Sequence, residues 1–519
     1  MINTRPSMVR NQAVISVVFW TIAVFAAWKV GGWLSRGDLN ALAYSAIGLV
    51  VSVIGIAILR NWRSGFYVFV VWLLFEDLIR KFMGNNMLIF FAKDALVAVM
   101  YVSFLAFIRR KRTPLFRPSF LMWFSLFFWL GAIQVFNPNS PSLFYGLLGF
   151  KLFFYYFPLI FVGYALIRDD SDLHRFIVIN MVLASVIATL GIVQAVVGPG
   201  FLNPAVLAPE IRELSTLERS APISGVKIFR PSSVFVSDGR FAMYLTMMWI
   251  LGLGASAYYF FRQQHRRRGQ IIVLIGAGLV AVAIALCGSR GAFVESSAST
   301  LVLIAAFVWG TPWRSGQAHR LMKAMGRVFW AGAFALLIAI TFFPETIGAH
   351  WAFYYETLSP TSPYSELVSR GRDYPTDNLI YAFTQANWMF GNGIGTASMG
   401  GQYVSRLLGE RHLDIGVESG WGNLMLEMGI PGLILWLAWT TAAVFSCWRV
   451  VHRLRQTAYF TMAFAVWWFV FLVLVPMTYN GLNPYENYIY NAYLWLLMGI
   501  LFKLPTLAFP PQLPAHPCA

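Results

Sequence analysis

Long apolar runs alternate with short polar connections along almost the whole chain. Runs of about 17 to 25 residues are long enough to cross the hydrocarbon core of a bilayer as helices, which pair their own backbone polar groups in lipid. We therefore predict an all-α polytopic membrane protein with about fourteen transmembrane helices. The predicted spans are residues 13–34, 41–59, 65–82, 88–108, 119–136, 143–167, 174–197, 241–261, 270–287, 291–310, 328–343, 422–446, 458–476 and 487–503.

Two connections are much longer than the rest, at residues 198–240 and 344–421. Loops beyond about 12–15 residues in compact proteins are usually functional or disordered. An apolar stretch at 378–390 predicts short helices that lie on the membrane within the second loop. We expect three parts: N-terminal helices with the first loop (1–343), the long outer loop (344–421), and C-terminal helices with a tail (422–519).

Composition and charge exclude a soluble protein and argue against a nucleic-acid partner. The chain is 58% hydrophobic and 12% charged, whereas soluble domains are about 25% charged. The net charge of +17 comes from basic clusters in short connections that all fall on one side if the N-terminus is cytoplasmic. This is the positive-inside pattern, and it places both termini in the cytoplasm and both long loops outside. The clusters lie at 60–63, 109–117, 262–268, 314–327 and 449–455.

The sequence shows no signature of a cofactor or a metal. Cys287, Cys447 and Cys518 lie far apart, without the spacing of a metal site or a disulfide framework. The chain has no phosphate-binding GxxxxGK[ST] loop. The glycine-rich segment 391–395 follows no predicted strand, so we expect a tight turn or a close backbone approach there. We predict that the protein needs neither a metal nor a cofactor.

Charged side chains inside predicted spans are costly in lipid and mark functional candidates. One group, in the third span, has two interpretations: salt bridges that staple helices together, with local pairs at i, i+4, or a functional site. Lys151, in the sixth span, has no oppositely charged neighbour in the sequence. It is expected to face an anionic ligand or to pair with a carboxylate on another helix. The group in the third span is Glu76, Asp77, Arg80 and Lys81.

Three arginines stand where outer connections meet the membrane. Arg230 and Arg240 flank the point where the first long loop re-enters, and Arg290 lies in a tight turn between two spans. An arginine is a permanent cation whose planar fork binds phosphate oxygens in pairs. Two interpretations remain open: these arginines grip ordinary phospholipid headgroups, or they bind a phosphorylated substrate. Outer loops seldom hold such clusters, which favours a substrate site for Arg230 and Arg290 together.

Three motifs along residues 225–445 resemble the O-antigen ligase and O-antigen polymerase superfamily. The first runs from Phe229-Arg230-Pro231 to Phe241–Leu245, and the second is the turn Gly288-Ser289-Arg290-Gly291-Ala292. The third joins 391–395 to Glu418-Ser419 and Gly429-Ile430-Pro431-Gly432. The family pattern there has His, then Asn, Ser or Gln, nine residues, then Gly-x-x-Gly. Ser419 and both glycines match, whereas Glu418 stands at the histidine position.

The resemblance implies a GT-C-like fold and an inverting, metal-independent glycosyltransferase at the periplasmic face of the bacterial inner membrane. Its donor would be a glycan on undecaprenyl pyrophosphate. Glu418 would take the acceptor proton in place of the family's histidine, a role that a carboxylate can fill, and Arg290 would stabilise the departing pyrophosphate. The expected catalytic residues are therefore Glu418 and Arg290. The expected substrate-binding residues are Lys151, Arg230, Arg240, Arg370, Arg372, His412 and Ser419.

Several functional alternatives stay open. The departure at Glu418 favours polymerisation of repeat units into exopolysaccharide or O-antigen over ligation to lipid A core. A protein O-oligosaccharyltransferase shares the same motifs and differs only in its acceptor. A flippase for lipid-linked glycans is a different class, and the long loop at 344–421 disfavours it. Glu418 also has a structural alternative, as the cap of the helix that follows it. Expected partners are lipid-linked glycans, membrane lipids, a chain-length regulator and export proteins.

Overall fold

The computed structural model describes most of the chain after its first 52 residues. Some predicted features lie outside the described residues. They are the span 13–34, most of the span 41–59, nearly all of the span 328–343, and His412. The described residues are 53–84, 86–112, 114–204, 209–262, 267–313, 337, 341–359, 361–362, 369–397, 401, 404 and 415–509.

The structure is about 76% helical, which confirms the prediction of an all-α membrane protein. Within the described residues, nine helices or helix pairs are long and apolar enough to cross a membrane, so the chain is a multi-pass membrane protein. The count of fourteen spans and the GT-C class stay predictions. The nine are α4 (Met87–Lys111), α6 with α7 (Leu143–Phe154, Leu159–Leu166), α8 (Asp170–Val197), α10 (Asp238–Phe261), α11 (Arg267–Leu286), α12 (Arg290–Gly310), α17 (Gly420–Arg453), α18 (Phe460–Leu472) with its continuation to Asn480, and α21 (Tyr488–Ala508).

Helices α3 (Trp62–Phe82) and α4 are shared between two compact units of the chain. The first unit comprises Met1–Phe69 and Asp94–Lys111, and the second comprises Val70–Lys93 and Arg112–Ala519. Within the first unit, the Trp62 ring packs edge-on against Phe104, with ring centroids 5.1 Å apart. The candidate residues that the structure describes all belong to the second unit.

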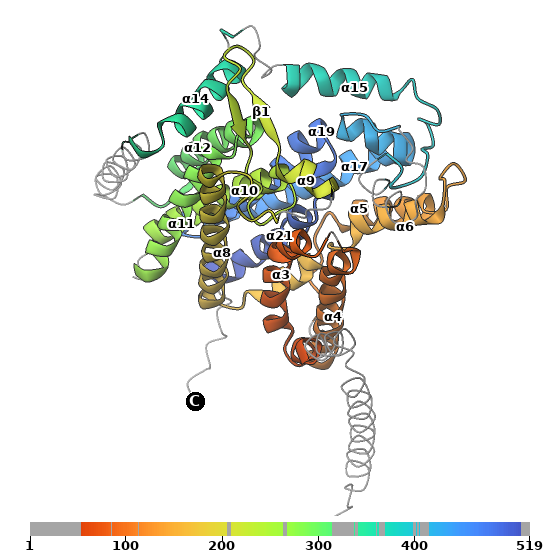
Figure 1. The fold of residues 1–519 in the computed structure, drawn as a ribbon. Coiled ribbons are helices and arrows are strands. Elements are labelled where there is room, and N and C mark those ends of the chain that lie inside the picture. Colours follow the sequence, from red (N-terminus) through yellow and green to blue (C-terminus); the bar gives the residue numbers. More distant parts are fainter. Residues whose placement is uncertain are drawn as a thin grey trace, which may run out of the picture. The chain divides into compact units, whose positions relative to one another are not determined.

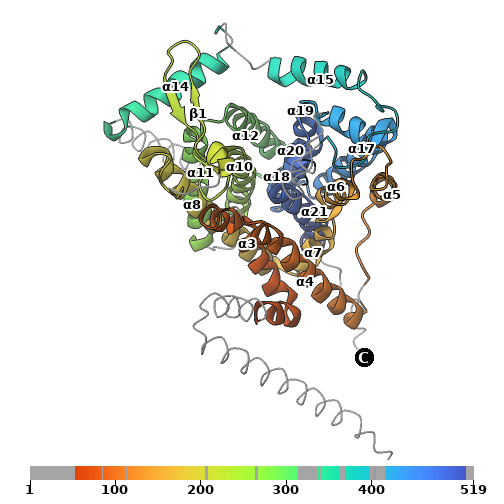
Figure 2. The same ribbon diagram turned by 45° about the vertical axis from the view of Figure 1, so that its right-hand side comes forward.

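Helix α21 is the buried centre of the second unit and packs closely against α7 (Figure 2). Glycines allow this approach, as small residues do between membrane helices. A Cβ atom added at Gly163 would lie 2.2 Å from the Leu496 carbonyl oxygen, and one at Gly499 would lie 2.0 Å from that of Ile160. Fully buried tryptophans pack where α17 meets α21: Trp436 and Trp439 come from α17, and Trp439 stacks on Trp495 of α21 with ring centroids 5.7 Å apart.

The Gly-x-x-Gly motif forms a kink inside α17. Gly429 has φ 70° there, a left-handed conformation that favours glycine. The loop 389–393 inserts at the kink, where Asn392 N donates to Leu426 O at 2.7 Å and Gly393 N donates to Glu427 O at 3.0 Å. Gly391 and Gly393 also have positive φ. The predicted close backbone approach at 391–395 is confirmed, and it supplies partners for carbonyls that the kink releases.

The two long loops meet each other at one end of the second unit. The first loop forms a hairpin of β1 (Glu218–Ser220) and β2 (Lys227–Phe229), and the second begins with α14 (Pro344–Leu358). Backbone N–H groups of Ile223 and Ser224, in the hairpin turn, donate to the Glu356 carboxylate of α14 at 2.7 and 3.1 Å. This contact agrees with the prediction that both loops lie on one side of the membrane.

A further helix of the second loop, α15 (Tyr374–Ala382), lies at the same end as α14 and the hairpin (Figure 1). It starts earlier than the predicted 378–390 and ends sooner. A π-helical turn, Ser369–Asp373, leads directly into α15, so helical structure begins well before residue 378. Turns follow Ala382, and Asn387 has φ 61°, a left-handed conformation that an α-helix does not contain, so the helix does not continue to the kink of α17.

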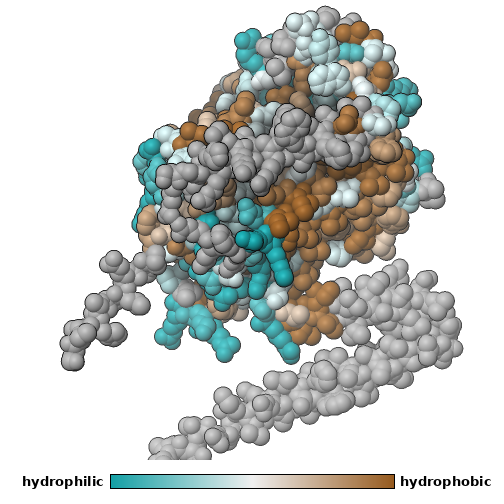
Figure 3. All heavy atoms as spheres, turned by 90° about the vertical axis from the view of Figure 1, so that its left-hand side faces the viewer, coloured by the Kyte–Doolittle hydropathy of each residue, from teal (hydrophilic) through white to brown (hydrophobic). Residues whose placement is uncertain are grey.

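Apolar side chains also cover much of the surface, as a lipid-facing protein requires. Figure 3 shows them gathered over a wide area of one face. Exposed apolar side chains follow the outer sides of α11 and α12 at helical spacing. They include Ile271, Leu274, Ile275 and Val282 on α11, and Leu301, Ile304 and Val308 on α12.

Candidate functional site: a buried cationic pocket

Two adjacent carboxylates of α3, Glu76 and Asp77, are almost wholly buried. Glu76 accepts a hydrogen bond from Lys93 of α4 at 2.9 Å, and Asp77 accepts one from Arg240 of α10 at 2.7 Å. Asp77 also pairs with Arg80 of its own helix at 2.9 Å. The staple interpretation therefore holds in part, but the pairs with Lys93 and Arg240 run between helices.

Asp77 and Lys81, one of the possible i, i+4 pairs in this group, do not form a hydrogen-bonded ion pair. Lys81 is fully buried, and its amino group donates instead to Ser232 Oγ and to the Ser233 carbonyl, both at 2.9 Å. These two serines precede α10 in the Arg230–Arg240 segment. Lys81 thus ties α3 to the point where the first long loop re-enters the membrane.

The two cations that pair with the α3 carboxylates, Lys93 and Arg240, also lie over aromatic rings. The Lys93 amino group lies 3.4 Å from the Phe90 ring centroid and 4.4 Å from that of Tyr488. The Arg240 guanidinium carbon lies 4.9 Å from the same Tyr488 ring. Cations over ring faces are attracted by the ring quadrupole, and more strongly where water is excluded. Tyr488 is therefore a shared support for Lys93 and Arg240.

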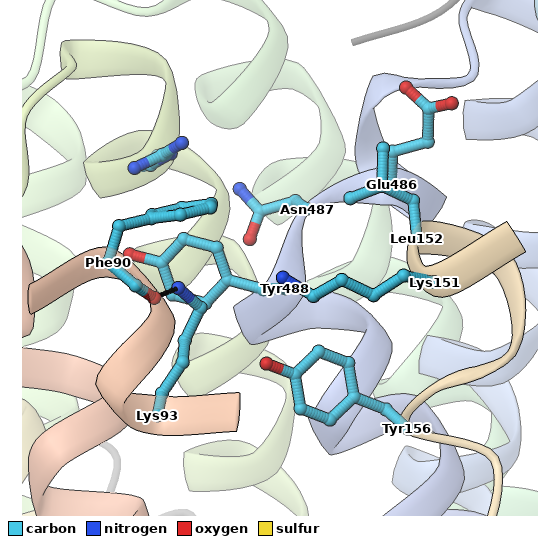
Figure 4. Close-up of a pocket in the computed structure, with 9 residues that line it drawn as sticks. Phe90, Lys93, Lys151, Leu152, Tyr156, Glu486, Asn487 and Tyr488 are labelled. Carbon is cyan, nitrogen blue, oxygen red and sulfur yellow. Dashed lines mark hydrogen bonds between the residues drawn. The ribbon is translucent and has the colours of Figure 1, made fainter. Parts of the chain in front are cut away.

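These side chains border a pocket within the second unit (Figure 4). Its lining contains three cations, Lys93, Lys151 and Arg240, and one carboxylate, Glu486. In Figure 4 the two lysines enter from different sides, whereas the Glu486 carboxylate points away from their amino groups. The remaining lining residues are Phe90, Leu152, Tyr156, Asn487 and Tyr488.

Two predicted substrate-binding residues, Lys151 and Arg240, come together in this pocket although 89 positions separate them in the sequence. Lys151 lies on α6, with its amino group 4.5 Å from the Phe91 ring centroid and 5.2 Å from that of Phe90. The pocket thus concentrates cationic groups on an aromatic surface, an arrangement suited to a small, strongly anionic group.

A second group of predicted residues meets at the start of α12. Arg230 pairs with Asp238 at 2.9 Å, and a Cβ atom added at Gly288 would lie 3.0 Å from Arg230 Cγ. Arg230 therefore packs on the turn that leads to Arg290, the first residue of α12. The Arg290 guanidinium carbon is 5.8 Å from the Phe353 ring of α14. Arg230 and the Ser-Arg-Gly turn thus lie together, but the pocket lining includes neither Arg230 nor Arg290. The assignments of Arg290 as a catalytic residue and of Arg230 as a substrate-binding residue stay predictions.

The third group lies in the long outer loop and is exposed. Glu418 pairs with Arg370 at 3.3 Å, and both side chains are more than half exposed. Arg372 pairs with Asp373, also at the surface. The pocket lining does not include Glu418. The assignment of Glu418 as the base and of Arg370 and Arg372 as substrate-binding residues stays a prediction.

Ser419, rather than Glu418, caps the helix that follows. Its hydroxyl accepts from Gly422 N at 3.4 Å at the start of α17 and donates to Tyr479 O, also at 3.4 Å. Serine suits this position because its short side chain reaches the unpaired N–H groups of the first turn. The capping alternative for Glu418 is therefore wrong. The Ser419 hydroxyl has a structural task, and its role in substrate binding stays a prediction.

Three carboxylates within or beside membrane spans escaped prediction from the sequence. Glu295 lies in α12, and Glu427 is buried in α17, where it accepts from Ala397 N at 3.1 Å. Glu486 lines the pocket just before α21. Their signal was present, since any carboxylate in an apolar segment is a functional candidate. Within the described ranges, no three His, Cys, Asp or Glu side chains gather as metal ligands would.

Comparison with known proteins finds no matching family model, no matching curated protein and no matching solved structure. The resemblance to the O-antigen ligase and polymerase superfamily therefore rests on the three sequence motifs. The geometry adds one observation to it: a cationic, aromatic pocket among helices that include membrane spans.

Proposed function

We propose that this protein is a membrane-embedded glycosyltransferase that polymerises oligosaccharide repeat units carried on undecaprenyl pyrophosphate. The product would be an exopolysaccharide or O-antigen. The observation that supports this most directly is the pocket that brings Lys93, Lys151 and Arg240 together over aromatic rings. The motif resemblance supplies the reaction type.

The pocket chemistry suits a pyrophosphate at the head of an apolar chain. Ammonium and guanidinium groups bind phosphate oxygens, and Phe90 and Tyr488 offer apolar surface beside them. The open space is small, with room for about one or two water molecules. Binding of a pyrophosphate would displace that water and move a flexible lining side chain, for which Lys151 is the candidate.

The proposed reaction is an inverting displacement at the anomeric carbon of the donor sugar. An acceptor hydroxyl oxygen forms the new bond, and the bond to the pyrophosphate oxygen breaks, with the electron pair leaving on the pyrophosphate. The acceptor proton passes to Glu418. Negative charge grows on the leaving pyrophosphate in the transition state, and cations fixed around it stabilise that state more than the ground state.

The role of Glu418 as the base requires a rearrangement of the long outer loop. Glu418 is exposed and pairs with Arg370, whereas the cationic pocket is lined by other residues. The proposal requires the outer loop to bring Glu418 to the sugar when donor and acceptor are bound. Binding energy from two long glycans is a suitable source for that ordering, since remote contacts can assemble a reacting geometry.

The location and partners belong to the same proposal. We assign the chain to the bacterial inner membrane, with both termini in the cytoplasm and the reaction at the periplasmic face. A chain-length regulator and export proteins would act beside it. If the acceptor is lipid A core or a protein, the chain is instead a ligase or a protein O-oligosaccharyltransferase with the same donor chemistry.

The test is chain growth in lipid vesicles that contain the purified full chain and a labelled undecaprenyl-pyrophosphate oligosaccharide. Lys151→Met is expected to reduce polymer formation at least tenfold. Lys503→Met is the matched control, because Lys503 lies near the end of α21, stacks on Tyr164 and does not line the pocket. Normal polymer length in Lys151→Met and Arg240→Met would reject the pocket. Movement of labelled lipid across the bilayer without polymer would identify a flippase.

A further inference from the structure

The two α3 carboxylates bond to two cations of the pocket lining without lining the pocket themselves. Glu76 and Asp77 are neighbours in sequence, yet they reach different helices, because successive helical residues point about 100° apart. Glu76 bonds Lys93 of α4, and Asp77 bonds Arg240 of α10. Both carboxylates are 1% exposed or less, and neither lines the pocket.

Each cation held in this way faces the same ring. Lys93 and Arg240 both lie over Tyr488, and the Phe90 carbonyl accepts a further bond from Lys93. An ammonium has three N–H donors and a guanidinium has five. A bond to one carboxylate therefore limits the directions that each cation can take, while the cation still lies in the pocket lining.

Asp77 is tied down in turn by its own neighbours. Arg80 donates to its other oxygen at 2.9 Å, and the Val236 N–H donates to the oxygen that faces Arg240 at 3.3 Å. Side chains whose partners are themselves bonded keep a single orientation. The α3 pair is thus built to limit the motion of Lys93 and Arg240.

We propose that Glu76 and Asp77 are positioning residues, which orient Lys93 and Arg240 to receive the pyrophosphate that leaves the donor. This inference rests on the proposed function and deepens it. The carboxylates do not touch the substrate. They order the cations before the reaction, so that the cations need little reorganisation when negative charge develops on the leaving group.

The experiment measures kcat and KM for chain growth in vesicles with Glu76→Gln and Asp77→Asn, which preserve side-chain shape. Each is expected to lower kcat about 100-fold, the scale of a misplaced catalytic group, with KM nearly unchanged because the loss falls in the transition state. Asp172→Asn is the matched control, since Asp172 pairs with exposed Arg168 at the start of α8. It is expected to keep the activity of the unsubstituted chain.

A double variant separates positioning from support of the fold. If Asp77 acts through Arg240, Asp77→Asn combined with Arg240→Met has the kcat of Arg240→Met alone. A further loss in the double variant would overturn the inference, because a purely structural role adds its own effect. Should Asp77→Asn fail to fold, the same comparison is made with Glu76→Gln and Lys93→Met.

The outcomes distinguish this inference from the proposed function. Loss of chain growth in Lys93→Met and Arg240→Met, with full kcat in both carboxylate variants, would reject the positioning role alone. Full activity in all four variants would reject the pocket as the donor site and the inference with it.

Discussion

The buried ion pairs of α3 and the exposed pair in the outer loop show what burial does to the same chemistry. Asp77 and Arg240 are 1% and 11% exposed and lie 2.7 Å apart, whereas Glu418 and Arg370 are 66% and 57% exposed at 3.3 Å. Water screens the outer pair and solvates each partner alone. In the interior, water cannot solvate Asp77 or Arg240 if its partner is removed, so each charge is stabilised by the other.

This difference separates two ways of placing charge for a reaction. In the interior, ion pairs hold Lys93 and Arg240 in the proposed mechanism before a substrate arrives. In the outer loop, Glu418 is exposed to solvent, where the proposed mechanism has it meet a large glycan.

The largest stability effect is expected from Asp77→Ala. It leaves Arg240 and Arg80 without their shared carboxylate, and breaking a buried pair typically costs about 3–5 kcal/mol. Thermal unfolding of the protein in detergent measures the loss. Asp373→Ala is the exposed counterpart, since Arg372 and Asp373 are 77% and 45% exposed, and its cost should stay below about 1 kcal/mol. Equal losses in the two variants would contradict the comparison.

Glu418→Gln should show the reverse pattern. The side chain is exposed, so the free energy of unfolding should change by less than about 0.5 kcal/mol. As the proposed base, however, its loss should slow chain growth by about 100- to 10,000-fold. The two measurements are unfolding in detergent and polymer formation in vesicles. Unchanged polymer formation in this variant would remove Glu418 from the mechanism and leave the pocket proposal standing.

A smaller effect is expected at the contact between the two outer loops, and it depends on pH. Burial acts to raise the pKa of Glu356, but hydrogen bonds from Ser224 and Ile223 outweigh it and lower the pKa below its usual 4.5. Because the carboxyl pKa is lower in the folded protein, the charged Glu356 stabilises the contact at pH values above the unfolded-state pKa. This stabilisation is lost as the pH falls through the folded-state pKa.

Hydrogen exchange at the Ile223 and Ser224 amides measures that loss. Exchange, corrected for its intrinsic pH dependence, should accelerate as the pH falls below about 4.5. Glu356→Gln should abolish this pH dependence, whereas Glu345→Gln, at the exposed start of α14, should retain it. Protection that stays constant in the unsubstituted chain down to pH 3 would show that the carboxylate does not hold the hairpin.

The smallest effect is expected from Arg370→Met, which removes the partner of Glu418. An exposed pair contributes about 0–1 kcal/mol and is screened by salt. Its effect on unfolding should therefore shrink further as salt rises from 0.01 to 1 M. A large loss that salt leaves unchanged would show that the outer pair is shielded from solvent, which would weaken the contrast with α3.

The sequence was a reliable guide to the helices and a partial guide to the site. Long apolar runs predicted each of the nine membrane-crossing helices among the described residues, because lipid leaves the backbone little choice. The glycine segment 391–395 was correctly expected to allow close approach. The boundaries of α15 were not correctly expected, since a π-helical turn leads into it and turns follow Ala382. Lys151 and Arg240 were both singled out as substrate-binding residues, but the pocket that they line contains Lys93 and neither Arg230 nor Arg290.

Hydropathy and the placement of basic residues thus determine that this chain is helical and crosses the membrane many times. These properties depend on each segment by itself, because its own hydropathy and flanking charges decide whether it lies in lipid or in water. Only the tertiary structure decides that Asp77 bonds Arg240 rather than Lys81, that Tyr488 supports two cations, and that Ser419 rather than Glu418 caps α17. Such pairings join residues far apart in sequence, and they depend on how the helices pack, for which periodicity carries no signal.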